Sequence, residues 1–131
     1  MKNKLTISAC LVFGFIICAA AIEPGKQTVE FKNLQVLPKD ISEKDLQRIM
    51  EIDFSKALGV NCNYCHPKLA GSDDLDFVTD AKGEKQAARS MMRMTMEINQ
   101  KYFGLQHPMI GDTLMSVTCK SCHRGEPYPT K

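Results

Sequence analysis

Four cysteines and two histidines of this chain define two copies of one short motif, C-x-x-C-H. The copies are Cys62-Asn63-Tyr64-Cys65-His66 and Cys119-Lys120-Ser121-Cys122-His123. This is the spacing of covalent c-type haem attachment. Two intervening residues in a helical turn bring both sulfurs to one side, where they form thioethers to the haem vinyl groups, and the next residue points an imidazole at the iron. The sequence therefore predicts two c-type haems, with four attachment cysteines and two histidine metal ligands: Cys62, Cys65, Cys119, Cys122, His66 and His123.

Zinc, disulfides and thiol redox chemistry are the alternative uses of these cysteines. Zinc ribbons separate their C-x-x-C pairs by about 15 to 20 residues, whereas 53 residues lie between Cys65 and Cys119. Disulfides would leave His66 and His123 without a role. A thioredoxin-like site needs a βαβ setting, and the segments around both motifs have the pattern of helix and loop. Haem attachment is the interpretation that uses all six residues.

The start of the chain has the pattern of an export signal. Lys2 and Lys4 precede an apolar run, and three alanines follow at positions 19–21, as in a signal peptide. We expect a signal peptide at residues 1–21 and a dihaem cytochrome domain at residues 22–131. The predicted location is the periplasm or the outer face of the cytoplasmic membrane.

Two alternatives for this leader stay open. The stretch from Leu5 to Ile22 borders on the length that spans a bilayer, so an uncleaved anchor would keep the protein at the membrane. A lipoprotein would use Cys10 or Cys18, but Cys10 comes too early in the apolar run and Cys18 follows a bulky isoleucine. Contact with the membrane is therefore expected only if the leader is retained.

Charge and composition exclude some classes of function. Without Lys2 and Lys4, the 17 basic residues become 15 and balance the 15 acidic ones, so we expect no nucleic acid as a partner. Tryptophan is absent and aromatic residues make up 7% of the chain. Such a small domain has few large side chains for its core, and the apolar faces of the haems would supply what is missing.

A helix is predicted immediately before the first motif. Ser42 and Asp45 have the spacing of a capping box, with Asp in place of the usual Glu, and Gly59 is a stop signal. Apolar residues recur between them with helical spacing at Leu46, Ile49, Met50, Phe54, Ala57 and Leu58. Met50 lies in the middle of this apolar face, so it is the candidate axial ligand of the first haem iron, with core packing as the alternative.

A second helix is predicted from about Glu84 to Phe103, ending at Gly104. At 100° per residue its apolar arc runs through Met94, Ala87, Ile98, Met91 and Tyr102, and its polar side carries Arg89, Arg93, Gln100 and Glu97. Met92, Met96 and Phe103 form a shoulder that suits packing on a porphyrin edge, another helix or a partner. Periodicity leaves Met91 and Met94 equally good as the axial ligand of the second haem iron.

Beyond the individual motifs, nearly all of the chain after residue 30 resembles the cytochrome c subunit of photosynthetic reaction centres, whose tetrahaem form has two tandem two-haem halves. The resemblance is carried by Asn33-Leu34-Gln35-Val36-Leu37, Leu46 to Met50, Leu58 to His66, Ala88-Arg89-Ser90-Met91 with Met94 and Ile98-Asn99, and Val117 to Gly125. It implies one two-haem half, in which Met50 ligates the first iron and Met91 the second, with Met94 in the core.

The resemblance does not extend to a second half, so photosynthesis itself is not implied. His107 lies near the place where the family's first half lends a histidine to a haem of the second half. We expect His107 to be a surface residue, with ligation of the second iron or of a neighbouring chain's haem as the alternative. The fold class is mainly α: two principal helices, each packed on a haem, crossed by an extended segment at residues 31–37.

The expected function is one-electron transfer between redox proteins, a donor and an acceptor, with both irons His/Met ligated. A dihaem peroxidase-like enzyme or a haem-based sensor with one open iron is the alternative. The acidic stretch with Asp73, Asp74, Asp76 and Asp80 is expected to be a solvated loop, and a docking patch for a basic partner is its functional alternative.

Overall fold

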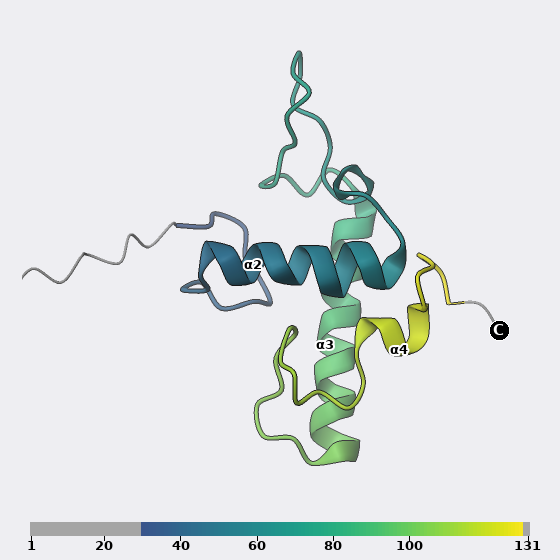
Figure 1. Ribbon diagram of the computed structural model, residues 1–131. Coiled ribbons are helices and arrows are strands. Elements are labelled where there is room, and N and C mark those ends of the chain that lie inside the picture. Colours follow the sequence, from purple (N-terminus) through teal and green to yellow (C-terminus); the bar gives the residue numbers. More distant parts are fainter. Residues whose placement is uncertain (1–29, 130–131) are drawn as a thin grey trace, which may run out of the picture.

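Two helical segments that cross each other organise the part of the chain that the computed structural model describes, residues 30–129 (Figure 1). The first segment combines α2 (Glu43–Ile49) with the π-helix η1 (Met50–Lys56), and it passes across the N-terminal half of α3 (Gly83–Phe103). The short helices are the 3₁₀ turn η2 (Cys62–Tyr64) and α4 (Cys119–His123). The signal peptide predicted at residues 1–21 lies outside the described residues.

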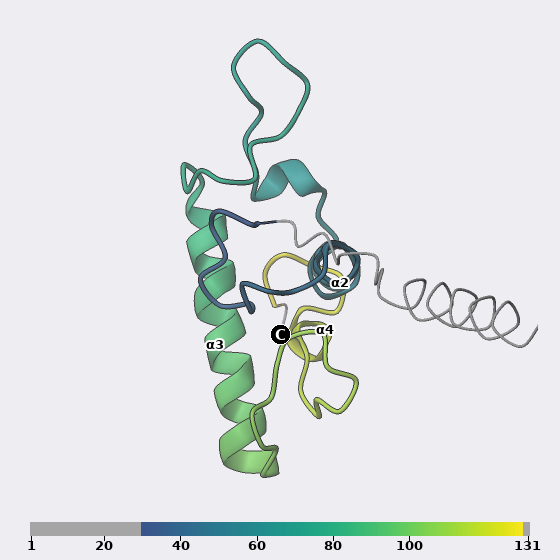
Figure 2. The ribbon, with the colours of Figure 1, turned by 90° about the vertical axis from the view of Figure 1, so that its left-hand side faces the viewer.

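The mainly α prediction is confirmed for the described residues. Between residues 30 and 129 there is no strand, only one isolated antiparallel bridge between Lys68 and Leu75. Seen end-on in Figure 2, α2 lies to one side of α3, with α4 below it. Within residues 30–129, no helix has both the length and the hydropathy needed to cross a membrane.

The predicted ends of the first helical segment are confirmed. Ser42 caps its start, because the Ser42 hydroxyl accepts a hydrogen bond of 3.1 Å from the backbone N–H of Asp45. At the other end Gly59 adopts a left-handed conformation with φ of +67°, and the N–H of Val60 donates to the carbonyl of Ser55 at 3.1 Å. This is the glycine-terminated end that sequence pattern indicates.

The interior of this segment differs from the prediction, because the helix changes type at Met50. From Met50 to Lys56 it is a π-helix, whose i→i+5 hydrogen bonds widen each turn. Each residue then advances by less than the 100° of an α-helix, so faces assigned from a constant 3.6-residue period drift along the segment. Such bulges occur frequently at functional sites, and this one begins at the candidate ligand Met50.

The apolar arc predicted for α3 is not the face that packs against the rest of the chain. The buried residues of α3 are Arg89, Met92, Thr95 and Asn99, whereas Met91 and Met94 are 47% and 46% exposed. Hydrophobic periodicity missed this face because three of its four residues are polar and satisfy their hydrogen bonds internally. The shoulder residues Met92 and Met96 contact the core, as packing on another helix predicts.

The core forms where α2, α3 and two loops meet. Its buried apolar residues are Leu37, Ile49, Met92 and Ile110. Leu34 and Val36 pack against them, so residues 31–37 do cross the helices, but as turns and bends rather than as an extended strand. This core is small for a domain of this size, in line with the expectation drawn from composition.

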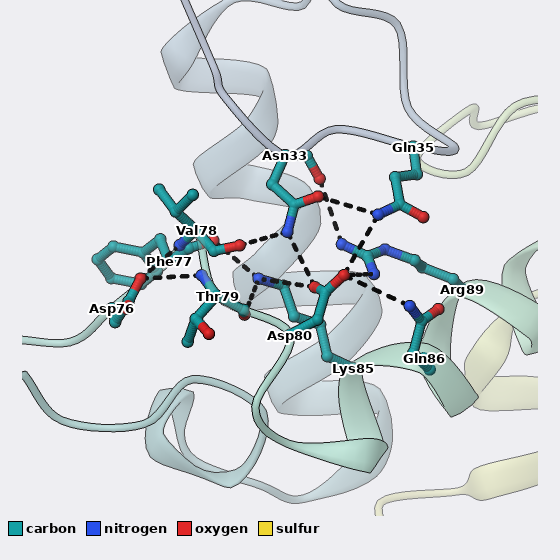
Figure 3. A network of polar contacts seen from close by, with 10 residues as sticks. All are labelled: Asn33, Gln35, Asp76, Phe77, Val78, Thr79, Asp80, Lys85, Gln86 and Arg89. Atoms are coloured by element: carbon teal, nitrogen blue, oxygen red, sulfur yellow. Dashed lines mark hydrogen bonds and ion pairs between the residues drawn. The ribbon is translucent and has the colours of Figure 1, made fainter.

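The loop between η2 and α3 projects from the body in both views (Figures 1 and 2), and its base is fastened by a polar network (Figure 3). Asp80 accepts a hydrogen bond of 2.9 Å from Arg89 Nη1 and another of 2.9 Å from Asn33 Nδ2. Lys85 adds an ion pair with Asp80. Asp80 is therefore a structural anchor as well as a solvent-exposed residue of the acidic stretch.

Candidate haem-binding site

Each C-x-x-C-H motif forms a single helical turn. In the first motif, the carbonyl of Cys62 accepts hydrogen bonds from the N–H groups of Cys65 and His66. Lys82 donates to the carbonyls of Asn63 and Tyr64 and so fastens this turn to the segment that leads into α3. The two sulfurs are thus held within one turn, the arrangement that thioether attachment needs.

The second motif is the helix α4. Its start is held by Ser121, an intervening residue of the motif, whose hydroxyl accepts a hydrogen bond of 3.0 Å from the N–H of Thr118. It ends at Arg124, which is left-handed with φ of +55°. The helix contacts both α3 and η1 (Figure 2). The second motif is therefore seated between the two helical segments.

Both histidines lie in surroundings that suit a metal ligand. Nδ1 of His123 lies 3.0 Å from the carbonyl oxygen of Glu126. Because a carbonyl can only accept a hydrogen bond, Nδ1 donates it, and Nε2 is the ring nitrogen available to a metal. Burial, followed by the positive charge of Lys85, lowers the pKa of His66, which favours its neutral ring.

His66 also provides a test of fit for a metal-bearing group. Its Nδ1 atom is buried without a hydrogen-bond partner from residues 30–129, and its ring packs edge-on against Phe77 with centroids 4.9 Å apart. A buried imidazole nitrogen costs free energy unless it has a hydrogen-bond partner, and iron bound at Nε2 would leave Nδ1 free to donate to one. The fit to a haem comes from the donor set of the two motif turns and from the apolar stripe of α3 with Met91 and Met94, which is exposed and which a porphyrin face would cover.

The four thiols are free, and the two that are partly buried, Cys65 and Cys119, are not of the activated, catalytic kind. Burial raises the pKa of Cys65. Burial, followed by the charge of Asp53, raises the pKa of Cys119 to about 11. Thioredoxin-like cysteines have a lowered pKa, so these thiols do not match that class. Among residues 30–129, no three side chains of His, Cys, Asp or Glu gather into a group that could hold a metal ion.

The candidate methionines occupy different environments. Met50 is half-buried and packs against the core at the start of η1. Met91 lies on the exposed side of α3, and Met94 is equally exposed. The structure thus places Met91 and Met94 on one face of α3 without distinguishing them. His107 is exposed in the loop after α3 and adopts a left-handed φ of +50°.

The two motifs are brought together at their flanks. The N–H of Gly125, two residues after His123, donates a hydrogen bond of 2.8 Å to the carbonyl of Ala57, at the end of the helix that leads to Cys62. A hydrogen bond with Tyr128, beyond the second motif, raises the pKa of Tyr64 inside the first motif. The segments around both motifs are therefore neighbours in space.

Comparison with known proteins identifies the family that shares this arrangement. The family model described as photosynthetic reaction centre cytochrome C subunit matches residues 16–131. The chain belongs to the reaction centre cytochrome c subunit family. The resemblance recognised from the motifs is confirmed by this match.

The relatives that this family member resembles are much longer. It is 30% identical over 99 residues to the photosynthetic reaction center cytochrome c subunit of Rubrivivax gelatinosus, covering 76% of this chain and 24% of the relative. It is 32% identical over 103 residues to the subunit of Roseobacter denitrificans, covering 77% and 26%. Cytochrome c-554 of Chloroflexus aurantiacus is 32% identical over 95 residues, covering 72% and 20%. The chain spans about a quarter of the length of these relatives, and no solved structure matches it.

Sequence reasoning missed what holds the second motif of this family member in place. Asn99 of α3 is fully buried, and its Oδ1 accepts hydrogen bonds from the N–H groups of Ser116 and Val117 at 2.8 and 3.0 Å. Its Nδ2 donates to the carbonyls of Val117 and Thr95 at 2.7 and 2.8 Å. This single amide fixes the chain just ahead of Cys119. The Ile98-Asn99 pair in the family resemblance was the signal available for it.

Proposed function

We propose that this chain is an exported dihaem c-type cytochrome that transfers single electrons between a donor and an acceptor protein, and that it is not an enzyme. Two covalently bound c-type haems are its cofactors. Cys62 and Cys65 attach the first haem and Cys119 and Cys122 the second, and His66 and His123 bind the irons. Met50 completes the first iron and Met91 the second. The family membership supports the class of protein, and the motif turns support the attachment residues.

The single observation that carries the proposal is the contact between the flanks of the two motifs. Gly125 and Ala57 share a backbone hydrogen bond of 2.8 Å, so haems attached at the two motifs would be close neighbours. An electron could then pass between them without a movement of the protein. Electron transfer between two haems of one chain needs a fixed, short distance between them, whereas two haems that work independently would not need it.

The residues of the chain then have defined tasks. Glu126 holds the His123 ring in the tautomer whose Nε2 can bind iron. Filling both axial positions with His and Met gives a closed haem with a raised potential, which suits electron transfer rather than activation of a substrate. Met50, half-buried against the core, is well restrained for such a role. The leader pattern at residues 1–21 and the need of c-type haem for attachment outside the cytoplasm support export.

Methionine variants test the ligation directly. Met50→Ala and Met91→Ala should each open one iron, so that the reduced protein binds carbon monoxide at one haem per chain and one midpoint potential falls. Met94→Ala is the matched control, because Met94 lies on the same helix face with the same exposure. We expect it to keep both irons closed.

The same experiment separates the electron carrier from the enzyme and sensor alternatives. An enzyme or sensor with one open iron would bind carbon monoxide before any mutation. Unchanged spectra in both Met50→Ala and Met91→Ala would refute the assigned ligands. An effect of Met94→Ala in place of Met91→Ala would move the second ligand by one helical turn.

A further inference from the structure

Asp53 is a carboxylate whose position the fold alone does not explain. Its Oδ2 atom is buried and has no hydrogen-bond partner from residues 30–129, a condition shared only with Nδ1 of His66 among those residues. Asp53 lies in η1, three residues after Met50. Burial raises the pKa of Asp53, and the charge of Arg48 acts in the opposite direction. The side chain as a whole is half-buried, but a buried carboxylate oxygen without a partner is costly, so its retention calls for a role.

The π-helix that carries Asp53 packs against the second motif, because α4, which contains that motif, contacts η1. After burial, the charge of Asp53 contributes most to the raised pKa of Cys119, ahead of the other charged groups. A charge that is shielded from water acts more strongly on its neighbours than an exposed one. The exposed cations of α4, Lys120 and Arg124, are screened by solvent.

The surroundings of the first motif differ in their charge balance. Lys85 and Arg89 act on His66 as cations, and Asp76 opposes them. Both cations are in turn paired with Asp80, at 3.5 and 2.9 Å (Figure 3). The cations that act on His66 are therefore balanced by carboxylates, whereas the half-buried carboxylate of Asp53, which has no ion-pair partner among the described residues, acts on Cys119. The two motifs lie in unequal electrostatic fields.

We propose that the carboxylate of Asp53 lowers the reduction potential of the haem at Cys119 and Cys122 below that of the haem at Cys62 and Cys65, so that electrons pass from the second haem to the first. This inference rests on the proposed dihaem function. A ferric haem carries one more positive charge than a ferrous one, so a nearby negative charge favours the ferric form. In each transfer the second iron is oxidised from ferrous to ferric and the first is reduced from ferric to ferrous, one electron for one.

Redox titration of the full haem-loaded chain tests this assignment. The step of the second haem is identified first, as the one displaced by Met91→Ala. Asp53→Asn should then favour reduction of the second haem at least tenfold, about 59 mV for one electron, and leave the other step in place. Glu51→Gln is the matched control, because Glu51 is an exposed carboxylate of the same π-helix. It should change neither equilibrium by more than about threefold.

Two further variants distinguish charge from structure. Asp53→Glu keeps the charge and should leave the potential of the second haem near that of the unmodified protein. Arg48→Gln removes the cation that offsets Asp53 and should lower the same potential, which keeps the test available if Asp53→Asn does not fold. Equal shifts in Asp53→Asn and Asp53→Glu, a shift of the first haem instead, or no shift would overturn the inference. A protein with fewer than two haems would overturn the proposed function itself.

Discussion

The backbone N–H of Gly125 donates a hydrogen bond of 2.8 Å to the carbonyl oxygen of Ala57. This bond joins the second residue after the second C-x-x-C-H turn to the end of the helix that precedes the first. Gly59, two residues after Ala57, completes the contact, because a Cβ atom at this position would overlap the carbonyl oxygen of Gly125. The approach of the two motifs thus depends on two glycines.

Replacing Gly59 should disrupt this approach. Gly59→Ala introduces a Cβ atom at a left-handed position, which costs about 1–2 kcal/mol, and forces the two backbones apart, which adds about 1–3 kcal/mol. Thermal unfolding of the haem-loaded protein measures the sum. Gly71→Ala is the control, because Gly71 has a similar φ of +76° but no atom within 4 Å of the new Cβ. Equal losses in both variants would show that the contact with Gly125 is unimportant.

Asn99 should be the most sensitive polar residue of α3. Asn99→Ala would leave the N–H groups of Ser116 and Val117 and the carbonyl of Val117 without their partner. We expect a loss of about 3 kcal/mol or more in urea unfolding, at about 1–3 kcal/mol for each buried group. Gln100→Ala, at an exposed neighbouring position, should change stability by less than about 0.5 kcal/mol. A loss in Asn99→Ala as small as that of the control would contradict the anchoring role.

Asp80 should make stability depend on pH in the acid range. The hydrogen bond from Arg89, with help from Asn33, lowers the pKa of Asp80 from 3.8 to about 2 in the folded chain. Its stabilising effect is therefore present above pH 4 and is lost as the pH falls from about 4 towards 2. Urea midpoints of the unmodified protein should drop more steeply over this window than those of Asp80→Asn.

Asp73→Asn is the control for this pH effect, since the Asp73 side chain is 97% exposed on the projecting loop. It should retain the acid-range slope of the unmodified protein. Parallel curves for the unmodified protein and Asp80→Asn would mean that the network in Figure 3 contributes no pH dependence.

Local signals predicted the boundaries of the helices well. Ser42, Gly59 and Gly104 act at short range, through caps and left-handed glycines, so their effect is readable without tertiary information. The same holds for the two motif turns, whose residues are adjacent in sequence. Membership of the family followed from the combination of such local motifs.

The packed face of α3 could not be predicted in the same way. Arg89 is buried because Asp80, in the loop before α3, and Asn33, remote in sequence, satisfy its guanidinium group. Asn99 is buried because the loop after α3 returns to it. Both side chains are polar, so hydropathy does not predict their burial, and only the tertiary structure supplies their partners. The π-helical turn at Met50 and the packing of η1 against α4 likewise leave no periodic signal.

The number of haems per polypeptide tests the central claim most directly. The measurement is the pyridine haemochrome of protein exported from a host with c-haem attachment machinery, compared with the Cys62→Ser/Cys65→Ser and Cys119→Ser/Cys122→Ser variants. We predict two covalent haems in the unmodified chain and one in each variant. An unmodified chain without covalent haem, where a control cytochrome is fully loaded, would contradict the dihaem account.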